Sequence, residues 1–309
     1  MSPGENRIET SVTSISGAES YRKPLLVKYI PEKTLLPKIY FIGIGINDFA
    51  DSSYNLKWCV QDIKDLTVTM RNKYGDQLVV LDTLYNERVT VENVKALKQK
   101  LLNTGINDKV IISYSGHGLL SKDYDYYLSA YNINFKKPEE GGIPYDDIEK
   151  LLDSIPARQK LLLLDACHSG EVDKEEMQKI KTSDNALVKN KVVANTGNKG
   201  VIITVTADNS NKLGLQNSFE LMQSLFVNVG KSTGAIIISA SGGVQFAQEK
   251  SELGHGVFTY SVIEAMKKYP TIKVSAFKKY IGNRVMELTN GLQKPTTRNE
   301  TIAVDWEVW

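Results

Sequence analysis

Two short motifs place a histidine and a cysteine directly after apolar runs. His117 lies in SGHG (115–118), and Cys167 lies in DACHSG (165–170). A free thiol has a pKa of about 8.5, so only a few per cent is thiolate at neutral pH. A histidine within hydrogen-bond reach can take the thiol proton and later give it to a leaving amine. If the two runs form neighbouring strands, the pair is a candidate dyad for nucleophilic catalysis.

Two backbone N–H groups and a further histidine, His255, complete the set of candidates. A tetrahedral intermediate needs oxyanion donors, and the backbone N–H groups of Gly118 and Cys167 adjoin the base and the nucleophile. His255 is the alternative base, but it precedes a predicted helix, where a positive imidazolium is disfavoured. The cysteines and histidines show no paired-ligand spacing, so the sequence does not favour a zinc site.

The elements that must position these residues alternate between strand and helix. The run Ile39–Ile46 is apolar and β-branched, which is typical of a strand buried on both faces. Alternation of this kind predicts an α/β fold with a mostly parallel sheet covered by helices, and ligands bind at the carboxyl ends of such strands. Strands are predicted at 39–46, 78–81, 108–115, 160–166, 201–207 and 235–240, and helices at 56–74, 91–102, 145–152, 219–229, 258–267 and 274–288.

Composition excludes several classes of function. Lys plus Arg number 38 and Asp plus Glu 36, so the net charge is +2, which argues against binding to nucleic acid or anionic membranes through bulk charge. No apolar run approaches a membrane span, and the first 30 residues lack a signal-peptide core. Two cysteines cannot form a disulfide framework, so we expect a reducing, cytoplasmic setting.

The chain is expected to hold one folded domain. Residues 1–36 show no sustained period and are interpreted as a flexible lead-in, a pro-segment or a linker. The single domain is predicted over 37–309. It divides into a first half at 37–173, a Lys-rich linker or insertion at 174–231, and a second half at 232–309.

The motifs resemble the caspase–metacaspase superfamily of cysteine peptidases over about residues 38–309. A histidine about 50 residues before the cysteine belongs to the caspase signature, and Cys167 follows His117 by 50 residues. Asp165 stands where caspases have glutamine, which resembles metacaspases and their prokaryotic, orthocaspase-type relatives. The resemblance rests on IGIGIN (42–47), CVQD (59–62), SGHG, DACHSG, ISASGG (238–243), Glu249 and GVFTYSVIEAM (256–266).

The resemblance implies a caspase-like fold, a mostly parallel six-stranded sheet sandwiched between helices, and cleavage after Arg or Lys. His117 and Cys167 match the catalytic dyad, and Gly118 matches the oxyanion-hole glycine. Two carboxylates in a narrow cleft suit a guanidinium or ammonium group. The positions that match the lining of the primary specificity pocket are Cys59, Asp62, Ser115 and Asp165.

Calcium is a further implication that the sequence does not favour. Asp146, Asp147 and Asp173 fall near positions that match an aspartate-built calcium site in many metacaspases. Asn132 stands where an acid is expected, and hard cations need several oxygen ligands. We therefore expect no cofactor, and Asp146 and Asp147 fit equally well as the acidic first turn of a helix.

The Lys-rich linker raises the question of regulation. A protease with an acidic pocket could cut itself there, although an ordinary solvated insertion explains the lysines equally well. The lysines are Lys174, Lys179, Lys181, Lys189, Lys191 and Lys199. The expected partners are a protein or peptide substrate with Arg or Lys at the cleavage site, and a regulatory protein or upstream sensor.

Two rival functions remain open from the sequence. A catalytically silent caspase-like interaction module would keep the fold without an assembled dyad. An esterase or amidase with the same dyad would not need Asp62 and Asp165.

Overall fold

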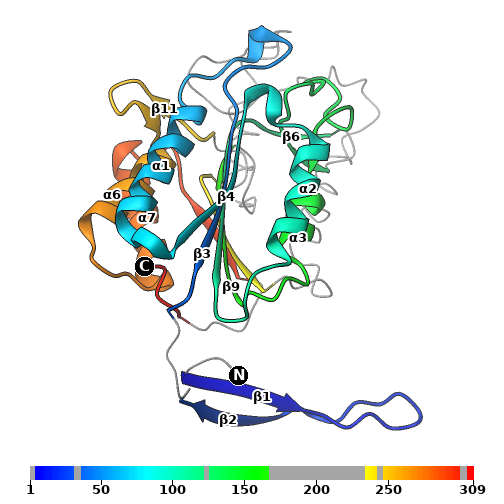
Figure 1. Cartoon of the computed structure of the whole chain (residues 1–309). Coiled ribbons are helices and arrows are strands. Elements are labelled where there is room, and N and C mark those ends of the chain that lie inside the picture. The colour runs from blue at the N-terminus through cyan, green and yellow to red at the C-terminus, as the bar shows by residue number, and fades with distance from the viewer. Residues whose placement is uncertain (1–3, 31–35, 122–124, 167–233, 242–245, 300–304) are drawn as a thin grey trace.

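A six-stranded sheet forms the centre of the protein. The computed structural model describes residues 4–30, 36–121, 125–166, 234–241, 246–299 and 305–309. The strand order is β13-β10-β9-β5-β3-β4, with five strands parallel and β13 antiparallel to β10 (Figure 1). The strands are β3 (Ile39–Gly45), β4 (Leu78–Tyr85), β5 (Lys109–Ser115), β9 (Gln159–Asp165), β10 (Ala235–Ser239) and β13 (Thr296–Asn299). The predicted α/β fold with a mostly parallel six-stranded sheet is confirmed.

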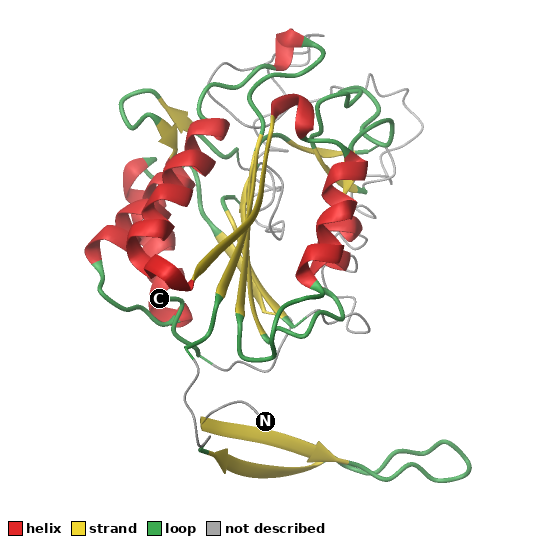
Figure 2. Cartoon of the chain, in the orientation of Figure 1, coloured by secondary structure: helices red, strands yellow, loops and turns green. Residues whose placement is uncertain are grey.

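Helices cover both faces of this sheet (Figure 2). One layer contains α1 (Cys59–Tyr74), α6 (Val257–Lys268) and α7 (Val274–Leu288), and the other contains α2 (Val91–Leu101) and α3 (Tyr145–Leu152). Successive side chains of a strand point to opposite faces. Phe41 accordingly belongs to the apolar cluster that contains α1, α6 and α7 residues, whereas Ile44 belongs to the cluster that contains α2 and α3 residues. Burial on both faces explains why these strands are continuous apolar runs.

The long predicted elements are present with small shifts at their ends. Helix α2 begins where Thr90 accepts a hydrogen bond from the backbone N–H of Asn93, as its side chain predicted. Gly75 ends α1 with a φ of 54°, which a glycine adopts without strain. Strand β4 extends four residues beyond the predicted end at Leu81. The strand and helix predicted at 201–207 and 219–229 lie outside the described residues, as does the Lys-rich segment.

Helix α1 begins three residues later than its apolar period predicts. The carboxylate of Glu249 accepts hydrogen bonds from the backbone N–H groups of Lys57 and Trp58, at 3.1 and 3.0 Å. Asn47 accepts from the N–H of Val60 at 3.0 Å. Two side chains from other segments therefore set the start of α1, and a local sequence pattern does not contain that information.

Three further sheets were not predicted from the sequence, and two of them consist of strands of only two or three residues. Strands of two or three residues are too short to show a period of two. The smaller sheets are β6-β7-β8 (Gly118–Leu120, Tyr126–Leu128, Ile143–Pro144), β11-β12 (Glu249–Lys250, His255–Gly256) and the hairpin β1-β2 (Gly4–Thr10, Lys23–Tyr29). The hairpin lies within the predicted lead-in, and Leu25 and Leu26 of β2 are exposed.

Candidate functional site

His117 lies directly after β5 in an aromatic pocket. Its side chain is buried, with the Phe49 ring centred 5.4 Å away and the Phe135 ring edge-on at 5.5 Å. Phe135 in turn stacks on Tyr54 at 3.8 Å. These rings pack around the imidazole, and none of them was predicted from the sequence.

One hydrogen bond determines which nitrogen of His117 can act as a base. Nε2 lies 2.8 Å from the backbone carbonyl oxygen of Tyr54. A carbonyl oxygen only accepts, so Nε2 donates and carries the proton. In the neutral imidazole the lone pair is then on Nδ1. General-base catalysis requires a ring nitrogen that can accept a proton, and in this arrangement that nitrogen is Nδ1.

The backbone around His117 is fixed by buried hydroxyl groups. The N–H of His117 donates to Oγ of Ser129 at 3.1 Å, and its carbonyl accepts from the N–H of Ser129 at 2.9 Å. The Tyr114 hydroxyl also lies within hydrogen-bond distance of the His117 carbonyl and of Ser129. A Cβ at Gly116 would lie 2.5 Å from the Tyr114 hydroxyl oxygen, so this position requires glycine.

Gly118 begins β6, opposite Leu128 of β7. His117 and Ser129 form the hydrogen-bonded pair next to them in the antiparallel ladder. Hydrogen-bonded and non-hydrogen-bonded pairs alternate along such a ladder. Since the Ser129 N–H donates to the His117 carbonyl, this alternation leads us to expect that the N–H of Gly118 points away from β7, as an oxyanion donor would.

The second predicted dyad residue, Cys167, lies outside the described residues. The described chain reaches Ala166, at the end of β9. Strands β5 and β9 are parallel neighbours with Ser115 opposite Asp165, and the N–H of Gly116 donates to the Asp165 carbonyl at 3.2 Å. The two motif-bearing strands are thus neighbours, which is the condition under which His117 and Cys167 form a candidate dyad.

Asp62 is fully buried in the first turn of α1. Its Oδ2 accepts from the Ser115 hydroxyl at 2.8 Å, and its Oδ1 accepts from the N–H of Gly256 and from Nδ1 of His255, both at 3.0 Å. The structure therefore brings Asp62 and Ser115 together, although 53 residues separate them. A solvated position on the helix surface is excluded.

Asp165 is buried at the end of β9. Its Oδ2 accepts from the N–H and the hydroxyl of Thr259 at 3.2 and 2.7 Å. Gly256 and Thr259 both belong to the start of α6, whose unpaired N–H groups and dipole favour negative charge. The N-terminus of α6 therefore supplies backbone donors to both Asp62 and Asp165. The role of Thr259 was not predictable from the sequence, because it lies 94 residues from Asp165 in the chain.

Cys59 is buried at the first position of α1, one helical turn before Asp62. Its Sγ lies 3.4 Å from Oε1 of Glu249. Residues three apart share a face of a helix, so Cys59 and Asp62 face the same side. The four residues matched to the specificity pocket come from the start of α1 and from the neighbouring ends of β5 and β9.

The aspartates matched to a calcium site have other neighbours. Asp147 contacts the ammonium groups of Lys95 and Lys150 at 3.2 and 2.9 Å, whereas Asp146 is exposed. Burial tends to raise the pKa of Asp147, but the hydrogen bonds and charges of the two lysines outweigh it and hold the pKa below its usual value. A carboxylate paired with two cations does not fit a calcium ligand. Asp173 lies outside the described residues.

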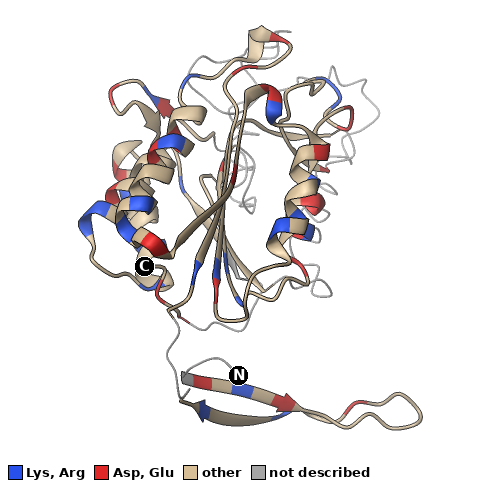
Figure 3. Ribbon diagram, viewed as in Figure 1, with Lys and Arg blue, Asp and Glu red and all other residues tan. Residues whose placement is uncertain are grey.

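The described ranges contain neither a metal-ligand cluster nor a membrane-spanning helix. Within them, no group of three or more His, Cys, Asp or Glu side chains is arranged to hold a metal ion. None of the helices in those ranges combines the length and the apolar character that crossing a bilayer requires. Lys and Arg intermix with Asp and Glu along α1 and α2 (Figure 3), in keeping with the near-zero net charge.

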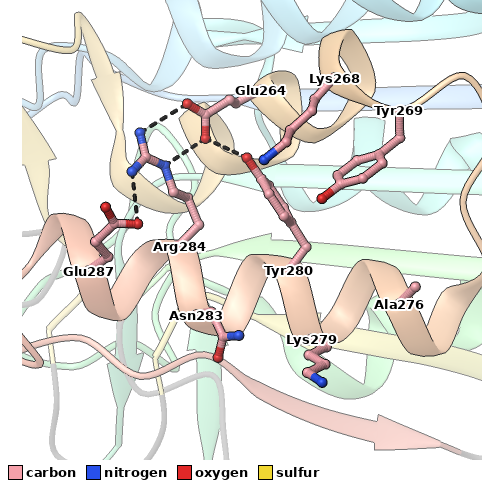
Figure 4. A pocket seen from close by; sticks show the side chains of 9 residues that line it. All are labelled: Glu264, Lys268, Tyr269, Ala276, Lys279, Tyr280, Asn283, Arg284 and Glu287. Carbon is pink, nitrogen blue, oxygen red and sulfur yellow. Dashed lines mark hydrogen bonds and ion pairs between the residues drawn. The ribbon is translucent and has the colours of Figure 1, made fainter.

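A groove of about 640 Å³ lies between α6 and α7 (Figure 4). Arg284 contacts Glu264 at 2.6 and 3.0 Å and Glu287 at 2.9 Å, and the Tyr280 hydroxyl donates to Glu264 at 2.7 Å. These paired charges join the two helices. None of the groove's lining residues belongs to the set at the strand ends.

The fold and the strand-end residues place the protein among α/β proteins whose site lies at the carboxyl ends of parallel strands. A family model described as "Caspase domain" matches residues 42–305, and the chain belongs to this family of cysteine peptidases. The predicted caspase–metacaspase relationship is therefore confirmed.

The similar proteins comprise fungal metacaspases and a bacterial structure. The chain is 34% identical over 142 residues to metacaspase-1 of Meyerozyma guilliermondii and 29% identical over 142 residues to metacaspase-1 of Schizosaccharomyces pombe. Each match covers 41% of this chain and about a third of the relative, 34% and 33%. A crystal structure of a Geobacter sulfurreducens protein shares the fold, with a TM-score of 0.56 and 19% identity over 85% of this chain and 93% of that one.

Proposed function

We propose that this protein is a cysteine endopeptidase that cleaves protein substrates after Arg or Lys. The observation that carries the proposal is the cluster of Asp62, Ser115 and Asp165, in which two buried carboxylates lie near the hydroxyl that begins the motif SGHG. Apart from His255, the donors described on these carboxylates are hydroxyl and backbone N–H groups, which are neutral. Negative charge held by neutral donors suits a guanidinium or ammonium group of a substrate.

The proposed reaction begins with proton transfer from the Cys167 thiol to Nδ1 of His117. The thiolate attacks the scissile carbonyl carbon, and the N–H groups of Gly118 and Cys167 stabilise the oxyanion. His117 then gives the proton to the leaving amine, which departs and leaves an acyl-enzyme. Water, deprotonated by His117, attacks the thioester, the new carboxylic acid leaves, and the thiol is restored. Every proton in the cycle passes through Nδ1.

Three finer features complete the proposal. Cleavage by the enzyme itself within the Lys-rich linker at 174–231 would supply Lys residues to its own pocket. A partner protein or an upstream sensor, as in prokaryotic defence or cell-death signalling, would control activity. No step is assigned to calcium, since the only matched aspartate with described side-chain contacts, Asp147, is paired with lysines.

Hydrolysis of a peptide panel tests the proposal. Fluorogenic peptides with Arg, Lys, Asp or Leu before the scissile bond are mixed with wild type, Cys167→Ala and Asp62→Asn, each with calcium and with chelator. We expect cleavage after Arg and Lys only, unchanged by chelator and abolished in Cys167→Ala. Asp62→Asn keeps the shape of the side chain but removes its charge, and should lower kcat/KM for Arg about 100-fold, the value of a charge-assisted hydrogen bond.

The same panel separates the rival functions. An esterase or amidase with this dyad would be indifferent to Asp62→Asn. An interaction module would hydrolyse none of the peptides even after limited proteolysis of the linker. Cleavage after Asp would contradict the assigned roles of Asp62 and Asp165.

A further inference from the structure

His255 contacts the proposed specificity pocket through its imidazole ring. Its Nδ1 lies 3.0 Å from Oδ1 of Asp62, and its Nε2 lies 3.4 Å from Oδ2 of Asp65. The His255 side chain is 13% exposed, whereas that of Asp62 is fully buried. A second titratable group thus shares the carboxylate that is proposed to bind the substrate cation.

The position of the ring is fixed by its backbone. His255 and Gly256 form β12, which pairs with β11, and the N–H of Gly256 donates to the same Oδ1 of Asp62. Gly254, at a φ of 66°, provides the turn that precedes β12. The backbone donor and the imidazole donor therefore approach Asp62 from adjacent residues.

The groups that face His255 come from α1, α6 and β11, and the residue lies just before the N-terminus of α6. Asp62 and Asp65 of α1 face the two ring nitrogens, and the Tyr260 ring of α6 lies 6.2 Å away. Lys250, opposite His255 in β11, donates instead to the Leu288 carbonyl at 2.6 Å and approaches Glu252 at 4.0 Å. An imidazolium donates from both nitrogens, so it can satisfy both carboxylates at once, whereas a neutral ring donates from one.

A substrate guanidinium and a protonated His255 would compete for the same negative charge. Like charges that share a site disfavour each other. Imidazole is the side chain whose charge ordinarily changes between pH 5 and 8. Loss of the His255 proton would restore the full negative charge of Asp62, and binding of Arg or Lys would favour that loss.

We propose that His255 is a specificity-determining residue that makes recognition of Arg and Lys depend on pH. Protonated, it offsets the charge of Asp62 and weakens the binding of basic residues; neutral, it leaves Asp62 available to them. The inference rests on the proposed function, because it concerns the same pocket. It assigns no proton transfer in the reaction to His255.

Proton release on binding tests this directly. The inactive Cys167→Ala protein is titrated at pH 6.5 with an acetylated peptide ending in Arg amide, in two buffers of different ionisation enthalpy. Calorimetry then gives the number of protons released. Binding should release a measurable fraction of a proton, because the peptide cation and the imidazolium compete for Asp62. Cys167→Ala/His255→Asn, whose amide can still donate to Asp62, should release none.

Kinetics supply a second comparison in proteins that retain Cys167 and His117. Between pH 8.0 and pH 5.5, KM for the Arg peptide should rise about tenfold in wild type, the loss expected when a charge-assisted contact to Asp62 is offset by a neighbouring cation. It should change less than twofold in His255→Asn, while kcat follows the same pH profile in both. An equal change of KM in the two proteins would overturn the inference.

A third measurement does not depend on the variant at His255. The imidazole resonance of His255 is titrated by NMR in Cys167→Ala, with and without the Arg peptide. The titration midpoint should move to lower pH in the presence of peptide, and an unchanged midpoint would overturn the inference. If Cys167→Ala binds no Arg peptide even at pH 8, the proposed function fails and this inference fails with it. Binding without linked proton release contradicts the inference alone.

Discussion

At the scale of single residues, the proposed chemistry depends on groups that fix His117. Its candidacy as the base could be predicted from the sequence, because its residue type, its spacing from Cys167 and its place after an apolar run all indicate that role. The Tyr54 carbonyl that sets its tautomer could not, because the polarity of a backbone oxygen is the same at every residue. Phe49 and Phe135 also escaped prediction, since an isolated aromatic residue is ordinarily part of the core.

Ser129 provides a prediction at this scale. Its hydroxyl accepts from the buried N–H of His117 and lies 2.8 Å from the Tyr114 hydroxyl. Ser129→Ala should lower the free energy of unfolding by about 1–3 kcal/mol, because a buried donor loses its acceptor. Urea unfolding measures the change. Ser275→Ala, which removes an exposed hydroxyl bonded to Asp305, should cost less than half as much. Equal losses would refute the structural role given to Ser129.

At the scale of elements, long helices and strands were predictable and their boundaries and short partners were not. The apolar period placed α1, and Thr90 marked the start of α2. The first turn of α1 depends on Glu249, which lies about 190 residues away in the chain. Strands β6, β7 and β12 carry or support the site, but each has only two or three residues, too few to show the alternation of apolar and polar residues that predicts a strand.

Glu249 allows the start of α1 to be tested. Glu249→Ala removes the acceptor of two backbone N–H groups at this helix end. We expect a loss of stability of about 1 kcal/mol, as for other helix caps. KM for Arg peptides should also rise, because the same turn carries Cys59 and Asp62. Glu252→Ala, at an exposed nearby position, is the control. A Glu249→Ala protein with unchanged melting and unchanged KM would contradict this account.

The contact between α6 and α7 gives a prediction about pH. Burial tends to raise the pKa of Glu264, but hydrogen bonds from Arg284 and Tyr280 outweigh it and hold the pKa below its ordinary value of 4.5. A lowered pKa in the folded state stabilises the protein above the unfolded pKa, and this contribution disappears as pH falls through the folded value. Wild type should exceed Glu264→Gln by about 1 kcal/mol at pH 7.

That difference should shrink as the pH falls below 4.5. Urea unfolding of both proteins at pH 7 and pH 3 measures it. A difference that persists undiminished at pH 3 would show that packing, and not charge, joins Glu264 to Arg284.

At the scale of the whole molecule, the candidate site is assembled from both halves of the domain. The parallel order of β3, β5 and β9 aligns Gly45, Ser115 and Asp165 at one edge of the sheet. Gly256 and Thr259, from the second half, then donate to Asp62 and Asp165. Sequence patterns predicted the strands of the first half and their common edge. They could not predict which residues of α6 meet that edge, because the pairing of distant segments is a tertiary property.

A cut between the halves should therefore leave the protein assembled. Strand β10 pairs in parallel with β9, and α6 lies beside α1 in the same layer. A site for an unrelated protease is inserted into the linker at 174–231, and the cut protein is examined by gel filtration. The two fragments should elute together at the mass of the intact chain and separate only in denaturant. Separation in native buffer would contradict an interface shared by the halves.

Covalent labelling tests the central claim most directly. A peptidyl-Arg chloromethyl ketone alkylates a reactive thiolate with loss of chloride, and the chain contains only two cysteines, Cys59 and Cys167. Intact-mass measurement and peptide mapping should show a single adduct, on Cys167. The rate should fall at least about 100-fold in His117→Ala, within the range of a general base, and the Asp analogue should react far more slowly. An adduct on Cys59, or equal rates for the Arg and Asp reagents, would contradict the proposed dyad and pocket.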